Sequence, residues 1–196
     1  MKLLFISPFP PLRGGISKET ETIYDYLKNK HDIYIVSFKK LYPQFLFPGK
    51  TQFLENNTNK KFNNIISLLD SLNPFSWVKT CNYIRSKNID SIIIRYWHPF
   101  FIPMYIYIMN SLKSSNHNIK FYCIADNISP HDKFPFSNFF LKKFFTYFYK
   151  CFVMSDNTLN QISTYIMREK VKKVFLPIKS NLGPLLDKKE SRNLLD

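Results

Sequence analysis

Glycine is scarce in this chain, because its 196 residues include only four, and two of them, Gly14 and Gly15, are adjacent. A dinucleotide-binding loop needs the spacing G-x-G-x-x-G and an acidic residue after the second strand. Here the expected second strand, about Asp32 to Ser37, runs into Lys39 and Lys40. The G-x-x-x-x-G-K-[S/T] phosphate loop is also missing. These absences argue against a nicotinamide dehydrogenase and against a nucleoside triphosphatase.

Cysteine is equally sparse, and Cys81, Cys123 and Cys151 lie in apolar segments without metal-ligand spacing. This pattern predicts a reduced, cytoplasmic protein with no metal site. The most apolar region, residues 92–109, is interrupted by Arg95 and three other charged, polar or proline positions, so it falls short of a membrane span. The first residues reach prolines too soon for a signal peptide.

Acidic residues are half as common as basic ones, 14 against 28, which leaves a net charge of +14. Together with 20 Phe and 12 Tyr, this excess points to an anionic partner such as nucleic acid, a membrane surface or a phosphorylated substrate. The same richness in Lys, Asn, Ile, Phe and Tyr is also what an AT-rich genome would produce. The charge therefore supports other arguments and carries none alone.

The most informative segment is a strand, a proline-rich turn, a glycine pair and a helix within the first 27 residues. The strand is expected at Lys2 to Ser7, and the helix from Ser17, with Thr20, Ile23, Tyr24 and Leu27 on one face. A helix start behind a glycine-bearing loop is a natural seat for phosphate. A plain strand-to-helix turn is the alternative interpretation.

Short apolar runs alternate with amphipathic stretches along the rest of the chain. Further strands are expected at residues 91–95, 119–125, 151–154 and 174–176, and helices at about residues 62–73, 75–87, 99–113, 137–149 and 156–168. This alternation predicts an α/β fold, a Rossmann-like parallel sheet with helices on both faces.

Polar groups follow three of the expected strands, at the edge where ligands bind in such sheets. The glycine pair follows the first strand. Arg95 and His98 follow another, where Arg95 could pair with a phosphate. Asp126, Asn127 and His131 follow the strand at 119–125, where Asp126 or His131 could act as a general base or orient a hydroxyl. Asp, Asn and Pro are also ordinary loop residues, so a structural role is the alternative for any one of them taken alone.

These segments together resemble the N-terminal half of family 4 (group 1) glycosyltransferases of the GT-B fold. The resemblance is carried by FISPFPPLRGGIS near the start, YPQFLFPGKTQ at 42–52, LNPFSW at 72–77, RYWHPFFIP at 95–103, ADNISPHDKFPF at 125–136 and VMSDN at 153–157. It covers nearly the whole chain.

The resemblance implies a retaining enzyme that transfers a sugar from a nucleotide sugar to a glycan or lipid-linked acceptor, as in polysaccharide biosynthesis. Residues 1–178 would form the acceptor-side domain, and residues 179–196 the linker and start of a donor-binding domain. Gly14 and Gly15 would face the donor diphosphate, Asp126 and His131 the reacting centre, and Arg95, His98 and Asn127 the substrates. No metal or cofactor is implied beyond the nucleotide sugar as co-substrate.

Two departures from the family pattern stand out. Many members have histidine where this chain has Asp126. The family's second domain, which holds most of the nucleotide sugar through basic residues and a glutamate pair, is not represented. We therefore expect this chain alone to be inactive, either as a truncated chain or as one subunit of a split enzyme with a separate donor-binding partner.

Two other classes of function remain open. A non-catalytic membrane-surface or polyanion-binding module could use residues 137–152 as an amphipathic anchor, although their spacing equally fits a core-facing helix. A nucleic-acid binder rests on charge alone, without a recognisable motif, and is not expected. The predicted location is the cytoplasm, with a peripheral position on the inner face of an anionic membrane as a second option.

Overall fold

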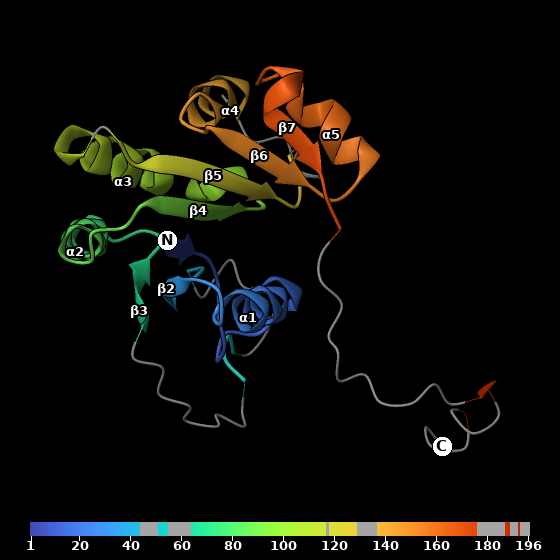
Figure 1. Ribbon diagram of the computed structural model, residues 1–196, viewed down its shortest axis with the longest axis horizontal. Helices are drawn as coiled ribbons and strands as arrows, with labels where there is room; N and C mark the ends of the chain where they lie inside the picture. The colour runs from blue at the N-terminus through green and yellow to red at the C-terminus, as the bar shows by residue number, and fades with distance from the viewer. Residues whose placement is uncertain are drawn as a thin grey trace.

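The computed structural model describes residues 1–43, 51–54, 64–116, 118–128, 137–175, 187–188 and 192. Its strands form one parallel sheet of order β3-β2-β1-β4-β5-β6-β7 (Figure 1). The strands are β1 (Lys2–Ile6), β2 (Asp32–Lys40), β3 (Ile65–Asp70), β4 (Ser91–Tyr96), β5 (Lys120–Ala125), β6 (Lys150–Val153) and β7 (Val171–Lys173). This is the Rossmann-like α/β fold that the sequence predicts.

Five α-helices connect these strands within the described residues: α1 (Gly15–Leu27), α2 (Pro74–Ser86), α3 (Ile102–Ser115), α4 (Ser137–Phe145) and α5 (Asp156–Ile162). Two 3₁₀ turns, η2 (Pro99–Phe101) and η3 (Arg168–Lys170), precede α3 and β7. No helix among the described residues is both long and apolar enough to cross a bilayer.

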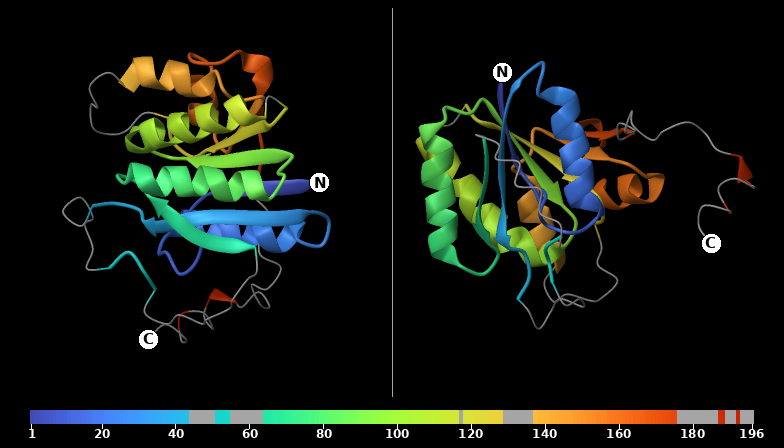
Figure 2. Two further views of the ribbon diagram at one scale, coloured as in Figure 1. Left: turned by 90° about the vertical axis from the view of Figure 1, so that its left-hand side faces the viewer. Right: turned by 90° about the horizontal axis from the view of Figure 1, so that it is seen from below.

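The two faces of the sheet carry unequal cover. Helices α2, α3 and α4 lie over one face of the sheet and α1 over the other (Figures 1 and 2). Side chains of α2, α3, α4 and α5 share one large core with the strands, and α1 packs over a smaller cluster. Successive side chains of β1 point to opposite faces of the sheet. Leu4 and Ile6 point into the large core, and Phe5 points toward α1. Parallel strands buried on both faces read as continuous apolar runs, which explains the composition of β1 and β4.

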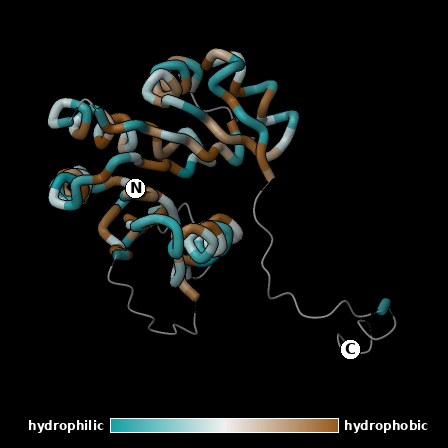
Figure 3. Tube along the Cα trace, in the orientation of Figure 1, coloured by the Kyte–Doolittle hydropathy of each residue, from teal (hydrophilic) through white to brown (hydrophobic). Residues whose placement is uncertain are grey.

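Hydropathy along the chain follows the same division (Figure 3). The interior strands are apolar, and polar residues gather on the outer sides of the helices and at the strand ends. Tyr96 of β4 packs against Phe144 and Phe145 of α4, with ring centroids of Tyr96 and Phe144 5.1 Å apart, and Phe144 in turn stacks on Tyr105 of α3. Each such ring contributes about 2 kcal/mol of hydrophobic stabilisation relative to exposure.

One expected helix is wrong. Residues 65–70, assigned to a helix spanning about 62–73, form β3 instead, paired in parallel with β2 from Ile35 opposite Ile65. The apolar residues at 65, 66, 68 and 69 fit either period, and the β-branched pair Ile65-Ile66 favours a strand once β2 offers hydrogen bonds. Phe62, the first residue of the expected helical face, lies outside the described residues.

Several boundaries also differ from expectation. Helix α1 begins at Gly15 rather than Ser17, and α4 ends at Phe145 and α5 at Ile162, each earlier than its periodicity suggested. The last strand is β7 at residues 171–173 rather than 174–176, because Val171 pairs with Cys151 of β6. Phe144 and Phe145 are fully buried, so the expected core-facing side of the segment 137–152 packs into the core, while Phe139 and Tyr149 are 69 % and 51 % exposed.

Candidate functional site

The chain reverses its direction of travel across the sheet between β1 and β4. From β1 it moves outward through β2 to β3, then crosses to β4 on the other side of β1 and continues to β7. In open α/β sheets the crevice outside the carboxyl ends of the strands at such a switch point is where ligands bind. We call this side of the sheet the carboxyl edge; it includes the residues after Ile6, Tyr96 and Ala125.

Three charged side chains meet at this switch point. Arg95, the fifth residue of β4, donates from Nε to Asp126 Oδ2 at 2.6 Å and from Nη2 to Asp126 Oδ1 at 2.5 Å. Its Nη2 also donates to a carboxylate oxygen of Glu19 on α1. The Arg95 side chain is only 2 % exposed, against 18 % for Asp126 and 42 % for Glu19. The three residues join α1, β4 and the end of β5 in one cluster.

Burial acts on the pKa of both Arg95 and Asp126. Burial lowers the pKa of Arg95, but Asp126 and then Glu19 outweigh it, so the guanidinium pKa stays above its ordinary value. Burial also raises the pKa of the Asp126 carboxyl, although Arg95 acts in the opposite direction. A bidentate Arg–carboxylate pair is among the most directional ionic contacts in proteins. Arg95 therefore holds the Asp126 carboxylate in one orientation.

Glu19 is the member of this cluster that sequence reasoning missed. A signal was available: Arg95 lies within an apolar strand, and a buried arginine is almost never found without acidic partners. Asp126 supplies one such partner from the neighbouring strand end. Glu19 lies in the first turns of α1, next to the glycine pair, and is one of the few acidic residues of that segment.

The start of α1 lies at the same edge. Gly14 is the N-cap of α1 with φ of 121°, a conformation that favours glycine. An added Cβ at either Gly14 or Gly15 would meet no atom within 4 Å. The helix is tied to the end of β1 by a 2.7 Å hydrogen bond between the hydroxyls of Ser7 and Thr20. The N-terminal amides of α1 are therefore held close to the sheet and open on their outer side.

A hollow of about 320 Å³ lies against this helix start. It is lined by Pro10, Leu12, Gly14, Gly15, Ser17, Lys18, Glu21 and Leu54. Residues 51–54 close one side by hydrogen bonding to the loop after β1, with Arg13 N donating to Gln52 O at 2.8 Å. The ammonium group of Lys18 and the helix N-terminus on this hollow favour an anion, whereas the carboxylate of Glu21, which also lines it, acts in the opposite direction.

The other predicted site residues, His98, Asn127 and His131, differ in what the structure shows of them. His98 lies at the carboxyl end of β4, where its Nδ1 accepts from the Phe100 amide at 3.1 Å and caps η2. Asn127 is exposed directly after Asp126. His131 lies outside the described residues. The structure thus brings Arg95 and Asp126 together, with Gly14 and Gly15 on the helix that carries Glu19, and gives His98 a capping contact.

An aromatic cluster follows β2 and β4 at this edge. Trp97 Nε1 donates to Tyr42 Oη at 2.8 Å, and the rings of Trp97 and Phe101 lie 4.5 Å apart between centroids. Gln52 fixes the Tyr42 segment by accepting from the Tyr42 amide at 3.1 Å and donating to its carbonyl at 2.8 Å. The loops beyond β2 and β4 are therefore rigidly joined beside the charged cluster. Within the described ranges, no group of His, Cys, Asp and Glu side chains is placed to hold a metal ion.

No family model matches the chain, and no curated protein sequence matches it. Solved structures do. An alpha-glucosyltransferase in complex with UDP and a 13-mer DNA containing a central A:G mismatch superposes with a TM-score of 0.57 at 14% identity, over 91% of this chain and 41% of that one. An alpha-glucosyltransferase with UDP-glucose and abasic-site DNA gives 0.52 at 15% identity, over 98% and 44%.

The third structure is the UDP-N-acetylglucosamine 2-epimerase from Rickettsia bellii, with a TM-score of 0.58 at 9% identity over 88% of this chain and 44% of that one. The chain thus spans less than half the length of each of these structures. At such low identity the likeness shows the fold alone, a Rossmann-like α/β fold that the chain shares with part of each of these structures.

Proposed function

We propose that this chain is the acceptor-side half of a retaining GT-B glycosyltransferase of family 4. In this proposal it binds a glycan or lipid-linked acceptor and closes over a nucleotide sugar held by a donor-binding half. Residues 179–196, of which only positions 187, 188 and 192 are described, would lead to that half. The chain alone would then be inactive.

The observation that carries the proposal is the convergence at the switch point. The open N-terminus of α1, the Lys18 hollow and the Glu19–Arg95–Asp126 cluster lie at one edge of the sheet, where ligands of this fold class bind. The fold similarity to two glucosyltransferases whose structures contain UDP or UDP-glucose supports the same interpretation.

The glycine pair would serve the leaving group. Sugar transfer from a nucleotide sugar leaves negative charge on the departing diphosphate, and helix amides with a nearby cation stabilise such charge. Gly14 and Gly15 present these amides without a side chain in the way, and Lys18 supplies the cation. This chemistry needs no metal ion or further cofactor.

The carboxylates would serve the acceptor. Asp126 accepts two hydrogen bonds from Arg95 and still has lone pairs for a hydroxyl donor, because each carboxylate offers about four acceptor positions. Glu19 is the more exposed of the two carboxylates. In this arrangement Asp126 orients an acceptor hydroxyl, Arg95 positions Asp126, and Asn127 and His98 contribute to the acceptor surface. His131, outside the described residues, stays a prediction for the reacting centre.

An NMR titration of the isolated chain with UDP and other nucleoside diphosphates tests the proposal. We expect weak, millimolar binding, with amide shifts at Gly14, Gly15 and Lys18. Lys18→Ala should weaken binding about threefold or more, as for an exposed ionic contact. Lys28→Ala, at the opposite end of the same helix, is the matched control and should leave binding unchanged.

The result that overturns the proposal is equally specific. Shifts confined to the far side of the sheet, or no shift with any nucleotide at concentrations where a glucosyltransferase control responds, would exclude this use of α1. Micromolar binding by the isolated chain would contradict the assignment of the donor site to another half.

A further inference from the structure

Positive charge is concentrated on the edge of the sheet opposite the candidate site. We call this side the amino edge: strands begin there, and α1, α2 and α3 end there. Its cations are Lys2, Lys28, Lys30, Arg85, Lys87, Lys113, Lys120, Lys150, Arg168 and Lys170, and its acids are Asp25, Asp32, Asp90 and Glu169. At the carboxyl edge the two signs are nearly balanced, with Arg13, Lys18, Lys39, Lys40, Arg95 and Lys173 beside Glu19, Glu21, Asp70, Asp126 and Asp156.

Most of the cations at the amino edge keep their charge unpaired. Among the described residues, the one ion pair at this edge joins Lys28 Nζ to Asp25 Oδ1 at 2.6 Å. Arg85 donates to neutral partners, including the hydroxyls of Ser111 and Ser115 at 2.7 and 2.9 Å. The field of this edge is therefore directed outward, toward an anion that the chain itself does not supply.

Lysines at this edge lie over exposed aromatic rings. Lys30 Nζ is 5.1 Å from the centroid of Tyr26, which is 61 % exposed, and Lys120 Nζ is 5.1 Å from the centroid of Tyr149, which is 51 % exposed. Such pairs present an apolar ring and a cation on one surface. This is the side-chain chemistry that suits the boundary between lipid headgroups and water.

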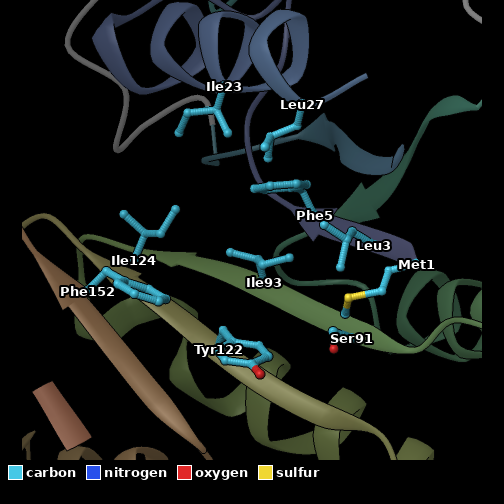
Figure 4. Close-up of a pocket in the computed structure, with 10 residues that line it drawn as sticks. All are labelled: Met1, Leu3, Phe5, Ile23, Leu27, Ser91, Ile93, Tyr122, Ile124 and Phe152. Carbon is cyan, nitrogen blue, oxygen red and sulfur yellow. The ribbon is translucent and has the colours of Figure 1, made fainter. Parts of the chain in front are cut away.

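An apolar groove of about 310 Å³ opens beside the same edge (Figure 4). The groove lies between α1, which contributes Ile23 and Leu27, and the sheet. Helix α1 covers only part of this face, and the groove opens over the strands that it leaves uncovered. The remaining lining residues are Met1, Leu3, Phe5, Ser91, Ile93, Tyr122, Ile124 and Phe152. Met1, at the amino-edge end of the groove, is 66 % exposed.

We infer that the amino edge is a docking surface for an anionic lipid bilayer. The unpaired lysines attract the headgroups, while Tyr26, Tyr149 and Met1 enter the boundary region beside the apolar groove. A nucleic acid would satisfy the lysines equally well, but it would leave the apolar groove and Met1 in water. The charge and the apolar surface together therefore favour lipid.

What docking means for acceptor access rests on the proposed function, whereas the test of docking itself does not. Strand β4 has six residues, so the two edges lie about 20 Å apart at ~3.3 Å per residue. A chain docked by its amino edge presents the carboxyl edge to the aqueous side. The acceptor group would then reach the site from water, either as a soluble glycan or as a headgroup long enough to span that distance.

Sedimentation with vesicles measures the docking directly. We expect binding to vesicles of phosphatidylglycerol with phosphatidylcholine that weakens as salt rises, and little binding to phosphatidylcholine alone. The variant Lys30→Glu/Lys120→Glu/Lys150→Glu should lower the partition coefficient about 100-fold or more at low salt. The control Lys39→Glu/Lys40→Glu/Lys79→Glu makes the same change in net charge elsewhere, and should lower it no more than about tenfold.

The two native tryptophans provide a second readout that needs no substitution. Trp77 and Trp97 both lie at the carboxyl edge, where Trp77 Nε1 donates to Asp70 O at 2.9 Å and Trp97 to Tyr42. Brominated lipids quench only fluorophores that enter the bilayer, so the native emission should persist on vesicle binding. A tryptophan introduced by Tyr26→Trp should be quenched.

Several results would overturn the inference. They are equal losses in both triple variants, binding to neutral vesicles as strong as to anionic ones, or quenching of the native tryptophans. Tighter binding to a DNA or RNA duplex than to anionic vesicles at the same salt would assign the edge to nucleic acid instead. Circular dichroism establishes that each variant is folded. None of these readouts depends on sugar transfer, so failure here leaves the proposed function standing, and the reverse also holds.

Discussion

The two edges of the sheet are built from the same strands and helices but carry different chemistry. At the carboxyl edge, charges of opposite sign are gathered inward, and Arg95 is buried between Asp126 and Glu19. At the amino edge, cations lie outward on exposed tyrosines, and few have an acidic partner. An inward, paired arrangement holds side chains in one geometry, as a site requires. An outward, unpaired arrangement offers charge to a large surface without fixing any single contact.

The sharpest test of the carboxyl edge is Gly15→Val in a complete enzyme that contains this half. An added Cβ at Gly15 meets no atom within 4 Å, but a valine side chain would occupy the space where a diphosphate would approach the helix amides. We expect turnover to fall at least about 1000-fold, equivalent to ~4 kcal/mol in the barrier. Gly15→Ala is the graded control and should lose much less. Normal turnover in a folded Gly15→Val enzyme would remove the diphosphate from this helix.

Replacement of Arg95 tests whether the inward pairing also holds the fold together. Arg95→Met keeps the volume but leaves Asp126 and Glu19 without their common partner at the end of a buried strand. We expect a loss of about 3 kcal/mol in the free energy of unfolding, at the lower end for breaking a buried pair because Glu19 is partly exposed. Urea denaturation measures it. Arg85→Met, on the exposed amino edge, should cost less, about 1 kcal/mol, because it removes only the exposed hydrogen bonds to Ser111 and Ser115.

Asp126→Ala tests the catalytic part of the same cluster. In a complete enzyme we expect about a 100-fold loss of turnover, ~2.7 kcal/mol in the barrier, with the fold retained. Asp126→Asn keeps the shape and should show whether charge or hydrogen bonding matters. If folded Asp126→Ala turns over normally, the carboxylate is structural and His131 becomes the better candidate.

Gly14→Ala has the smallest expected effect and concerns the backbone alone. Gly14 has φ of 121°, so a side chain there is strained even though space is free around it. We expect a loss of about 1–2 kcal/mol in unfolding free energy. The matched change Gly15→Ala should cost nothing, because Gly15 is the first helical residue and alanine favours a helix. Equal melting temperatures for the two variants would show that the turn relaxes to accept alanine.

The uneven quality of the sequence predictions has a physical origin. Elements with a single clear period, such as α1, β4 and β5, were predicted to within a few residues of their bounds. Residues 65–70 were not, because Ile65, Ile66, Leu68 and Leu69 fit both a helix and a strand, and the partner strand β2 decided between them. The ends of α4 and α5 were placed too late, because periodicity continues past the point where a helix stops.

The sequence by itself determined the fold class, the glycine-bearing start of α1 and the presence of polar residues after β4 and β5, because these depend on local periodicity and on which residues end a strand. Only the tertiary structure decided which of those residues meet. Asp126 and Arg95 are 31 positions apart and Glu19 is 76 positions from Arg95, so their contact follows from the pairing of β4 with β5 and the placement of α1 at the switch point. The division of charge between the two edges arises in the same way. Every strand of a parallel sheet points in one direction, so residues scattered along the chain at strand starts and helix ends are brought to one side of the molecule.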